Sequence, residues 1–248
     1  MSEPADTRRL LVLQHIGCEP PAAYGDVLEE RGIPADTVNL HAGEPLPDVR
    51  DYAGIIAMGG PMGTYDDALH PWLALEKREI ERAVRAGMPF WGVCLGAQLL
   101  AASLGGRVHP GPQPEVGVLA VSLAPAAEHD PVFGAAPPVF DALQWHGDTY
   151  ELPEGAVRLA GSELYEQQAF VFRRAYALQF HIEVSADLLS EWTTVPEYAA
   201  SLAALPGPDP AAQLISQARR AQDESVALAR SLFSRWLERV AGLASGQS

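Results

Sequence analysis

Short apolar runs alternate with amphipathic patterns along the first half of the chain, and this alternation limits the fold more than any other feature of the sequence. Short apolar runs are typical of strands, and apolar residues three and four apart are typical of helices. Strands that alternate with helices form a parallel sheet covered by helices on both faces. We therefore expect strands at residues 10–14, 37–40, 54–58 and 89–93, and helices at 21–31 and 70–86.

After Gly106, strand-like runs follow one another at close spacing, which predicts a small β-rich insertion whose last strand rejoins the main sheet. From Pro210 onward, apolar residues recur every three or four positions. This apolar stripe could bind a partner protein, but such stripes more often pack against the sheet of their own domain. We therefore expect C-terminal helices packed on the same domain. The Pro-rich segment 205–210 predicts a linker between a domain over residues 1–205 and a helical extension over 206–248. The strand-like runs expected after Gly106 lie at residues 118–123, 139–145, 156–160, 169–172 and 176–180.

The charge balance argues against two classes of partner. The chain has 17 basic and 32 acidic residues, which gives a formal net charge of −15, and the acidic residues are dispersed. We therefore expect no nucleic acid and no membrane as a partner, and no apolar run approaches the ~18 residues of a membrane span. Two cysteines, Cys18 and Cys94, are too few for a disulfide framework and lack metal-ligand spacing, so we expect no metal and a cytoplasmic location.

A cysteine lies between two glycines where the expected strand at 89–93 runs into a helical pattern. The motif Gly92-Val93-Cys94-Leu95-Gly96 is typical of a nucleophile elbow, a sharp turn that exposes its central side chain above the sheet. A sulfur at the start of a helix is favoured as a thiolate by the backbone dipole. The motif therefore predicts that Cys94 is a nucleophile, whereas a buried structural cysteine is the simpler alternative.

A histidine and a glutamate two residues apart follow the last expected strand. On an extended chain, residues i and i+2 point to the same side, so Glu183 can orient the ring of His181. A histidine held in this way can protonate a leaving group and later activate water. This pair is the expected acid/base of the Cys94 chemistry.

A glycine turn follows the expected strand at 54–58. Glycines in Met58-Gly59-Gly60-Pro61 leave backbone N–H groups free to approach an oxyanion. We expect the N–H of Gly60, together with that of Leu95, to form a two-donor oxyanion hole. A plain turn is the alternative for this motif alone.

These three ordered motifs, with Trp145-His146-Gly147-Asp148, make the chain resemble the class I (triad-type) glutamine amidotransferases. The resemblance runs from the first strand to the helix after Glu183, and it is closest to the free-standing branch that is similar to the amidotransferase domain of GMP synthase. One departure is Ile182, which stands where the family commonly has proline. An aliphatic residue keeps His181 and Glu183 on one face, so we interpret it as a subgroup feature.

The resemblance implies a flavodoxin-like sheet and a triad that hydrolyses the γ-amide of glutamine through a glutamyl thioester. Cys94 would be the nucleophile, His181 the acid/base and Glu183 the residue that orients it. The resemblance also implies that five residues hold the substrate: Gly59, Gln98, Gln144, Trp145 and His146. His146 would thus belong to the substrate pocket and not to the catalytic set.

The fate of the ammonia is open at this point. The roughly 60 residues after Glu183 are too few for a synthetase domain, and no Gly-rich phosphate loop is present, so we expect no cofactor. One hypothesis is a stand-alone glutaminase that delivers ammonia to a partner synthetase. The others are a hydrolase or peptidase that cleaves γ-glutamyl compounds without a partner, and a catalytically silent binding module on the same fold.

Overall fold

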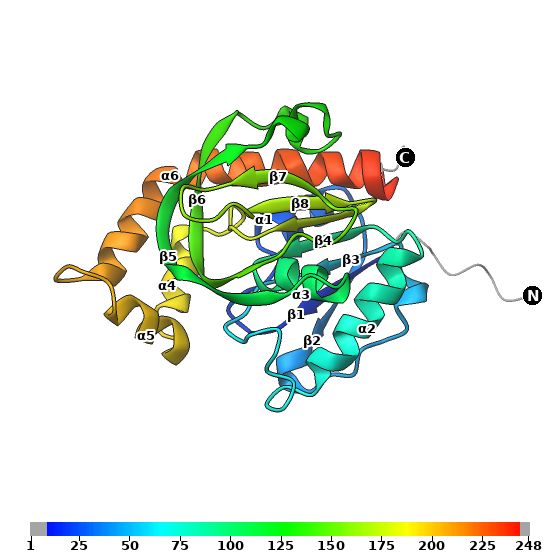
Figure 1. Ribbon diagram of the computed structural model, residues 1–248, viewed down its shortest axis with the longest axis horizontal. Helices are drawn as coiled ribbons and strands as arrows, with labels where there is room; N and C mark the ends of the chain where they lie inside the picture. The colour runs from blue at the N-terminus through cyan, green and yellow to red at the C-terminus, as the bar shows by residue number, and fades with distance from the viewer. Residues whose placement is uncertain (1–8, 244–248) are drawn as a thin grey trace, which may run out of the picture.

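The computed structural model describes residues 9–243, and its central feature is one nine-stranded sheet in the order β2-β1-β3-β4-β9-β8-β7-β5-β6 (Figure 1). Five strands at one side of the sheet, β2, β1, β3, β4 and β9, pair in parallel. The other pairings are antiparallel. The strands are β1 (Leu10–Gln14), β2 (Ala35–Asn39), β3 (Gly54–Ala57), β4 (Phe90–Val93), β5 (Val108–Leu123), β6 (Val139–Tyr150), β7 (Val157–Gly161), β8 (Ala169–Phe172) and β9 (Ala175–Leu178).

This sheet confirms the predicted α/β class and the β-rich insertion. Strands β5 to β8 leave the parallel part after β4, and β9 returns to pair with β4. The structure lengthens the insertion, because β5 begins at Val108 rather than at residue 118. Its first part contains prolines, and its register with β6 shifts between Pro110 and Glu115. Prolines interrupt a ladder, which is why the pattern did not predict a strand there.

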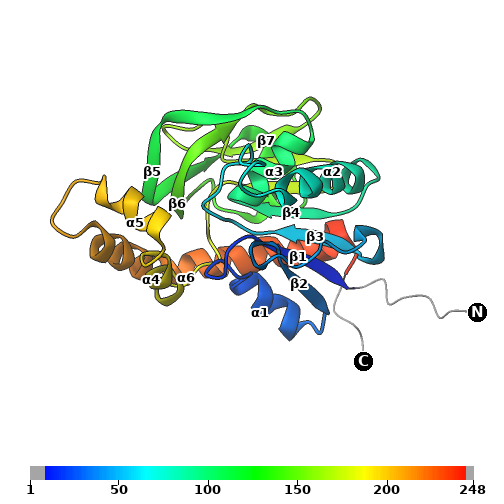
Figure 2. The same ribbon diagram turned by 90° about the horizontal axis from the view of Figure 1, so that it is seen from below.

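Helices cover both faces of the sheet (Figure 2). Apolar residues of α1 (Ala23–Glu30) and α6 (Pro210–Trp236) share one core with the sheet. Those of α2 (Trp72–Arg85) and α3 (Leu95–Ser103) share the core on the opposite face. Short 3₁₀ helices cover Leu40–Ala42, Val49–Asp51, Pro125–His129 and Phe133–Ala135, and a π-helical turn over Leu237–Ala241 follows α6.

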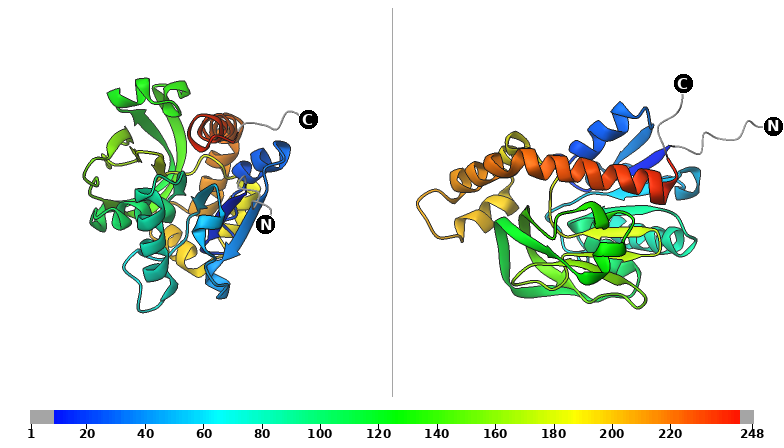
Figure 3. Two further views of the ribbon diagram at one scale, coloured as in Figure 1. Left: turned by 90° about the vertical axis from the view of Figure 1, so that its right-hand side faces the viewer. Right: turned by 90° about the horizontal axis from the view of Figure 1, so that it is seen from above.

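The C-terminal helix α6 spans 27 residues and runs along the length of the molecule (Figure 3). Asp209 caps it by accepting a hydrogen bond from the Ala212 N–H. Phe233 and Trp236 are fully buried in the core that α6 shares with the sheet. The predicted linker 205–210 joins α5 to α6. The division at residue 205 stays a prediction, and residues 1–8 and 244–248 of its two parts lie outside the described residues.

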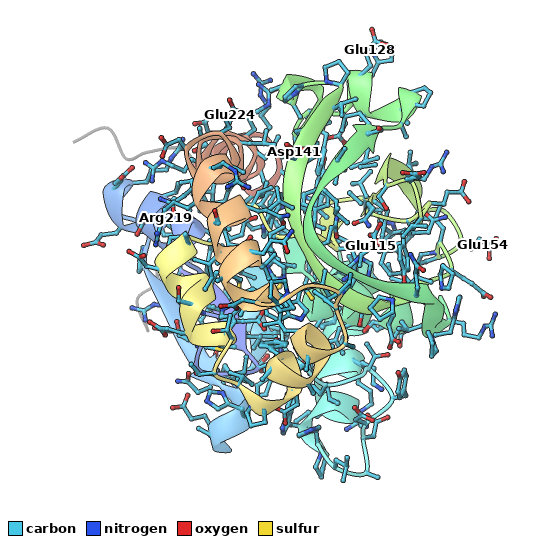
Figure 4. The ribbon with its side chains drawn as sticks, turned by 90° about the vertical axis from the view of Figure 1, so that its left-hand side faces the viewer. Glu115, Glu128, Asp141, Glu154, Arg219 and Glu224 are labelled. Atoms are coloured by element: carbon cyan, nitrogen blue, oxygen red, sulfur yellow. The ribbon has the colours of Figure 1, made fainter. Side chains whose placement is uncertain are left out.

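Two short helices, α4 (Ala186–Trp192) and α5 (Pro196–Ala203), close one end of the molecule beside the β5–β6 hairpin (Figure 4). Trp192 of α4 and Tyr198 of α5 pack in one apolar cluster with Trp145 of β6. A helix after Glu183 was expected, and α4 is that helix. The bounds of α4 and α5 were not predicted, because each helix is shorter than the window in which helical periodicity is measured. Across residues 9–243, the structure contains no helix that combines the length and apolar character of a membrane span.

Candidate active site

Cys94 follows β4 and precedes the first residue of α3. Its backbone has φ 52° and ψ −108°, a conformation that residues other than glycine seldom adopt. The Cys94 N–H donates to the Leu178 carbonyl of β9 at 2.7 Å, and the helix begins at Leu95. The structure therefore has the strand, sharp turn and helix expected of a nucleophile elbow.

The glycines on either side of Cys94 are required by close backbone approaches. A β-carbon on Gly92 would lie 2.6 Å from the Gly96 carbonyl oxygen. A β-carbon on Gly96 would overlap the Ala57 carbonyl at the end of β3. Only glycine fits at either position, and this explains the spacing seen in the sequence.

His181 and Glu183 follow β9 and are almost completely buried. His181 Nδ1 lies 2.8 Å from Glu183 Oε1, and Glu183 Oε2 accepts a hydrogen bond from the Ile182 N–H at 3.0 Å. A carboxylate on Nδ1 keeps the proton on that nitrogen and leaves Nε2 for exchange with other groups. Trp192 of α4 packs edge-on against the His181 ring, with the ring centres 4.9 Å apart.

The side chains of Cys94 and His181 are in contact, although they are far apart in the sequence. Burial lowers the pKa of His181, but the Glu183 carboxylate and a hydrogen bond with the Cys94 side chain together raise it well above 6.5. The imidazolium form of His181 is thus favoured beside the sulfur. A thiol next to an imidazolium is the arrangement that activates cysteine nucleophiles.

The glycine turn after β3 lies next to Cys94. The Gly96 N–H donates to the Met58 carbonyl at 3.1 Å, which ties the start of α3 to this turn. Across residues 9–243, no protein acceptor is paired with the N–H of Gly60 or of Leu95. Two unpaired donors on adjoining turns are what an oxyanion hole requires.

A pocket of about 390 Å³ opens above this turn. The walls come from the segment after β3, from α3, from β5 and β6, and from α5. His181, Glu183, Gly59 and Gln144 are buried behind the wall rather than part of it. Of the predicted site residues, the pocket is lined by Gly60, Cys94, Gln98, Trp145 and His146.

Two glutamines connect α3 to the cysteine. Gln98 Nε2 donates to Gln179 Oε1 at 3.1 Å, and Gln179 Nε2 lies 3.8 Å from Cys94 Sγ. Gln179 precedes the buried His181 segment and was not among the predicted site residues. The Gln179 side-chain amide therefore connects the Gln98 side chain with Cys94 Sγ.

Both ring nitrogens of His146 have protein partners. Nδ1 donates to the Asp148 carbonyl at 3.0 Å, while Nε2 lies 3.2 Å from both Gln144 Oε1 and Glu115 Oε2. Glu115 lies on β5 (Figure 4) and also accepts a hydrogen bond from Gln168 Nε2 at 2.8 Å. A ring held in this way has no free nitrogen for proton transfer, and the place of His146 outside the catalytic set stays a prediction.

A buried carboxyl that the sequence did not predict, that of Glu19, also lies near His181 and Glu183. The Tyr198 hydroxyl donates to Glu19 Oε1, while Oε2 has no hydrogen-bond partner among the described residues. Burial raises the pKa of Glu19 above 4.5, against the opposing effects of His181 and Tyr198. Glu19 lies just after β1, at the carboxyl edge of the sheet where the other candidate site residues gather. This position was the one signal in the sequence that could have identified Glu19 as a site residue. Tyr198 gave no signal, because nothing in its surrounding sequence points to a site.

The described residues contain no group of three or more His, Cys, Asp or Glu side chains arranged to hold a metal ion. The groups gathered at the pocket are a thiol, an imidazole, a carboxylate and backbone N–H groups. These are the groups that nucleophilic attack on a carbonyl requires.

Comparisons with known proteins agree with this geometry. The family model described as "Glutamine amidotransferase class-I" matches residues 26–190. One subunit of the glutamine-hydrolysing GMP synthase of Methanoregula boonei is 31% identical over 159 residues, which cover 62% of this chain and 79% of that protein. The glutamine-hydrolysing GMP synthase of Thermomicrobium roseum is 38% identical over 136 residues, 53% of this chain but only 23% of that longer protein. A crystal structure of a glutamine amidotransferase from Thermotoga maritima superposes with a TM-score of 0.84 at 32% identity, covering 94% of this chain and 99% of that one. The chain therefore belongs to the class-I glutamine amidotransferase family.

Proposed function

We propose that the chain hydrolyses the γ-amide of glutamine through a glutamyl thioester on Cys94 and passes the ammonia to a separate synthetase partner in the cytoplasm. The observation that supports this most strongly is the contact between the Cys94 side chain, which lines the pocket, and His181, which is bonded to Glu183. The similarity to one subunit of the Methanoregula boonei GMP synthase supports the partner, because an enzyme named by its subunits contains more than one.

The first half of the reaction forms the thioester. The Cys94 thiolate attacks the γ-carbonyl carbon, and the resulting oxyanion accepts hydrogen bonds from the N–H groups of Gly60 and Leu95. His181 Nε2 then gives its proton to the amide nitrogen, the C–N bond breaks and ammonia leaves.

The second half releases glutamate. His181 takes a proton from a water molecule, and the water oxygen attacks the thioester carbon. The C–S bond breaks, glutamate leaves and the thiolate–imidazolium pair is restored. Glu183 stays ionised throughout, orients the ring and stabilises the imidazolium.

A second candidate function is hydrolysis of larger γ-glutamyl amides without a partner. The pocket of about 390 Å³ lies in the range of sites that hold drug-sized ligands, and glutamine is a much smaller molecule. The lining includes Asp66, Asp148 and Glu197, and no Lys or Arg is among the described residues that form it. An acidic lining favours a leaving group that carries an amine.

One assay separates the two functions. Purified protein and its Cys94→Ala variant are incubated with glutamine and with γ-glutamyl amides of neutral and amine-bearing leaving groups, and glutamate and ammonia are measured. Cysteine-dependent release of ammonia from glutamine supports the first function. Turnover of the larger amides without turnover of glutamine rejects it in favour of the second.

A further inference from the structure

A second histidine–glutamate pair lies directly behind the glycine turn. His15 follows β1 and Glu76 is on α2, and both side chains are completely buried. His15 Nε2 lies 2.9 Å from Glu76 Oε1, while His15 Nδ1 lies 2.9 Å from the Met58 oxygen and 3.2 Å from the Gly59 oxygen. Carbonyl oxygens only accept hydrogen bonds, so Nδ1 carries a proton and donates it to both.

Helix α2 holds the His15 ring from two directions. Trp72 stacks on the ring with centres 5.6 Å apart and planes 18° apart, and Glu76 lies one turn further along the helix. Burial lowers the pKa of His15, but Glu76 and the two carbonyls together raise it above 6.5. An imidazolium donates stronger hydrogen bonds than a neutral ring. The ring is therefore a rigid donor aimed at the glycine turn.

This contact determines the direction of the Gly60 N–H. In a trans peptide, the carbonyl of Gly59 and the N–H of Gly60 belong to one plane and point in opposite directions. Because His15 binds the Gly59 oxygen, the Gly60 N–H points away from the His15 ring. Rotating this peptide would break the bond to His15 and leave the carbonyl oxygen of the buried Gly59 without that donor.

We propose that His15, held by Glu76, is a positioning residue that fixes the Gly59–Gly60 peptide so that the Gly60 N–H meets the oxyanion formed at Cys94. Neither His15 nor Glu76 lines the pocket, so both act through the turn. The inference rests on the proposed function, because an oxyanion forms only when the cysteine attacks a carbonyl.

Two reactions of the same thiol separate this role from plain core packing. Hydrolysis of the amide substrate forms an oxyanion, whereas alkylation of Cys94 by iodoacetamide displaces iodide from a saturated carbon and forms none. A displaced Gly60 N–H therefore slows hydrolysis and leaves alkylation unchanged. A general loss of structure slows both.

The variants are built on Glu76→Gln, so that no unpaired carboxylate is left in the core. Glu76→Gln alone keeps a partner for His15 Nε2 and should hydrolyse substrate within about threefold of the parent. Adding His15→Leu removes the donor to the turn and should lower kcat by about 10²-fold. Adding His15→Asn instead restores a donor near the position of Nδ1 and should recover most of that loss. Iodoacetamide should alkylate all three at rates within about twofold.

His70→Ala is the matched control, because His70 also packs against Trp72, with ring centres 5.5 Å apart, but makes no hydrogen bond to the turn. It should leave both reactions unchanged, and thermal unfolding is followed for every variant.

Three outcomes overturn the inference. If the His15→Leu variant hydrolyses substrate as fast as its Glu76→Gln background, His15 does not position the turn, and the proposed function stands. If hydrolysis and alkylation fall together, His15 serves only the fold. If the Cys94→Ala variant hydrolyses substrate as fast as the parent, the proposed function fails and the inference fails with it.

Discussion

His181 Nδ1 lies 2.8 Å from Glu183 Oε1, and the two side chains are each about 1% exposed. The pair is almost completely buried, so the protein groups around it dominate the pKa of the His181 ring. The contact with the Cys94 side chain lies on the same ring. The interaction of His181 with Cys94 thus connects the segment after β9 with the elbow after β4.

The two cysteines should differ completely in function. Burial and the nearby Glu19 raise the pKa of Cys18 to about 11, so Cys18 holds little thiolate at neutral pH. Cys94→Ala should abolish turnover and labelling by an electrophilic glutamine analogue, and Cys18→Ala should leave both intact. Peptide mapping of the labelled protein identifies the modified residue. Equal losses in the two variants would reject the assignment of Cys94.

Glu183→Gln should reduce the rate without unfolding the protein. The amide keeps an acceptor but loses the charge that stabilises the imidazolium, and the comparable change in a serine-protease triad costs on the order of 10⁴-fold in kcat. Steady-state kinetics measures the loss, and circular dichroism checks the fold. A variant as active as the parent would remove Glu183 from the mechanism.

Gly96→Ala should destabilise the protein, because its β-carbon would overlap the Ala57 carbonyl at the end of β3. Overpacking of this kind costs about 1–3 kcal/mol in the free energy of unfolding. Gly17→Ala is the matched control, since the nearest atom to its β-carbon would be His41 Nε2 at 3.8 Å. Urea unfolding should show the loss for Gly96→Ala and a change within about 0.5 kcal/mol for Gly17→Ala. Similar stabilities for both variants would contradict the close packing at the elbow.

Glu19 should make the stability of the protein depend on pH. Burial raises the pKa of its carboxyl in the folded state, so above pH 4.5 the folded protein holds a proton that the unfolded chain has lost. The contribution of Glu19 to stability is therefore present below pH 4.5 and is lost as the pH rises through the folded-state pKa, by up to about 1.4 kcal/mol per pH unit. Glu19→Gln is neutral at every pH and should remove this slope.

The measurement is urea unfolding of the parent and of Glu19→Gln between pH 4.5 and 7.5. Glu29→Gln, which removes an exposed carboxyl on α1, is the control and should follow the parent. Parallel curves for the parent and Glu19→Gln would show that Glu19 titrates alike in the folded and unfolded states.

Local patterns predicted most of the fold. The strand at 169–172 agrees with β8, and the helix expected at 70–86 contains α2, Trp72–Arg85. These elements are visible in a sequence because their apolar periodicity is continuous. The start of β5 at Val108 was not predicted, because prolines and a register shift interrupt the alternation of apolar and polar residues there.

The site was predictable where its residues lie in short motifs. Cys94, with its flanking glycines, and His181, with Glu183, each carry their signal within five residues. His15 and Glu76 are 61 positions apart, and only the packing of α2 behind the glycine turn brings them together. A contact of this kind leaves no local pattern, so only the folded structure reveals it.

The central claim is that Cys94 becomes acylated during turnover. The most direct test is to mix the protein with glutamine or a γ-glutamyl amide, quench the reaction with acid within one turnover and map the peptides by mass spectrometry. We predict a glutamyl group on the peptide that contains Cys94, lost on treatment with hydroxylamine and absent in Cys94→Ala. Turnover with no acylated Cys94 peptide at any quench time, or with the acyl group on another residue, would contradict it.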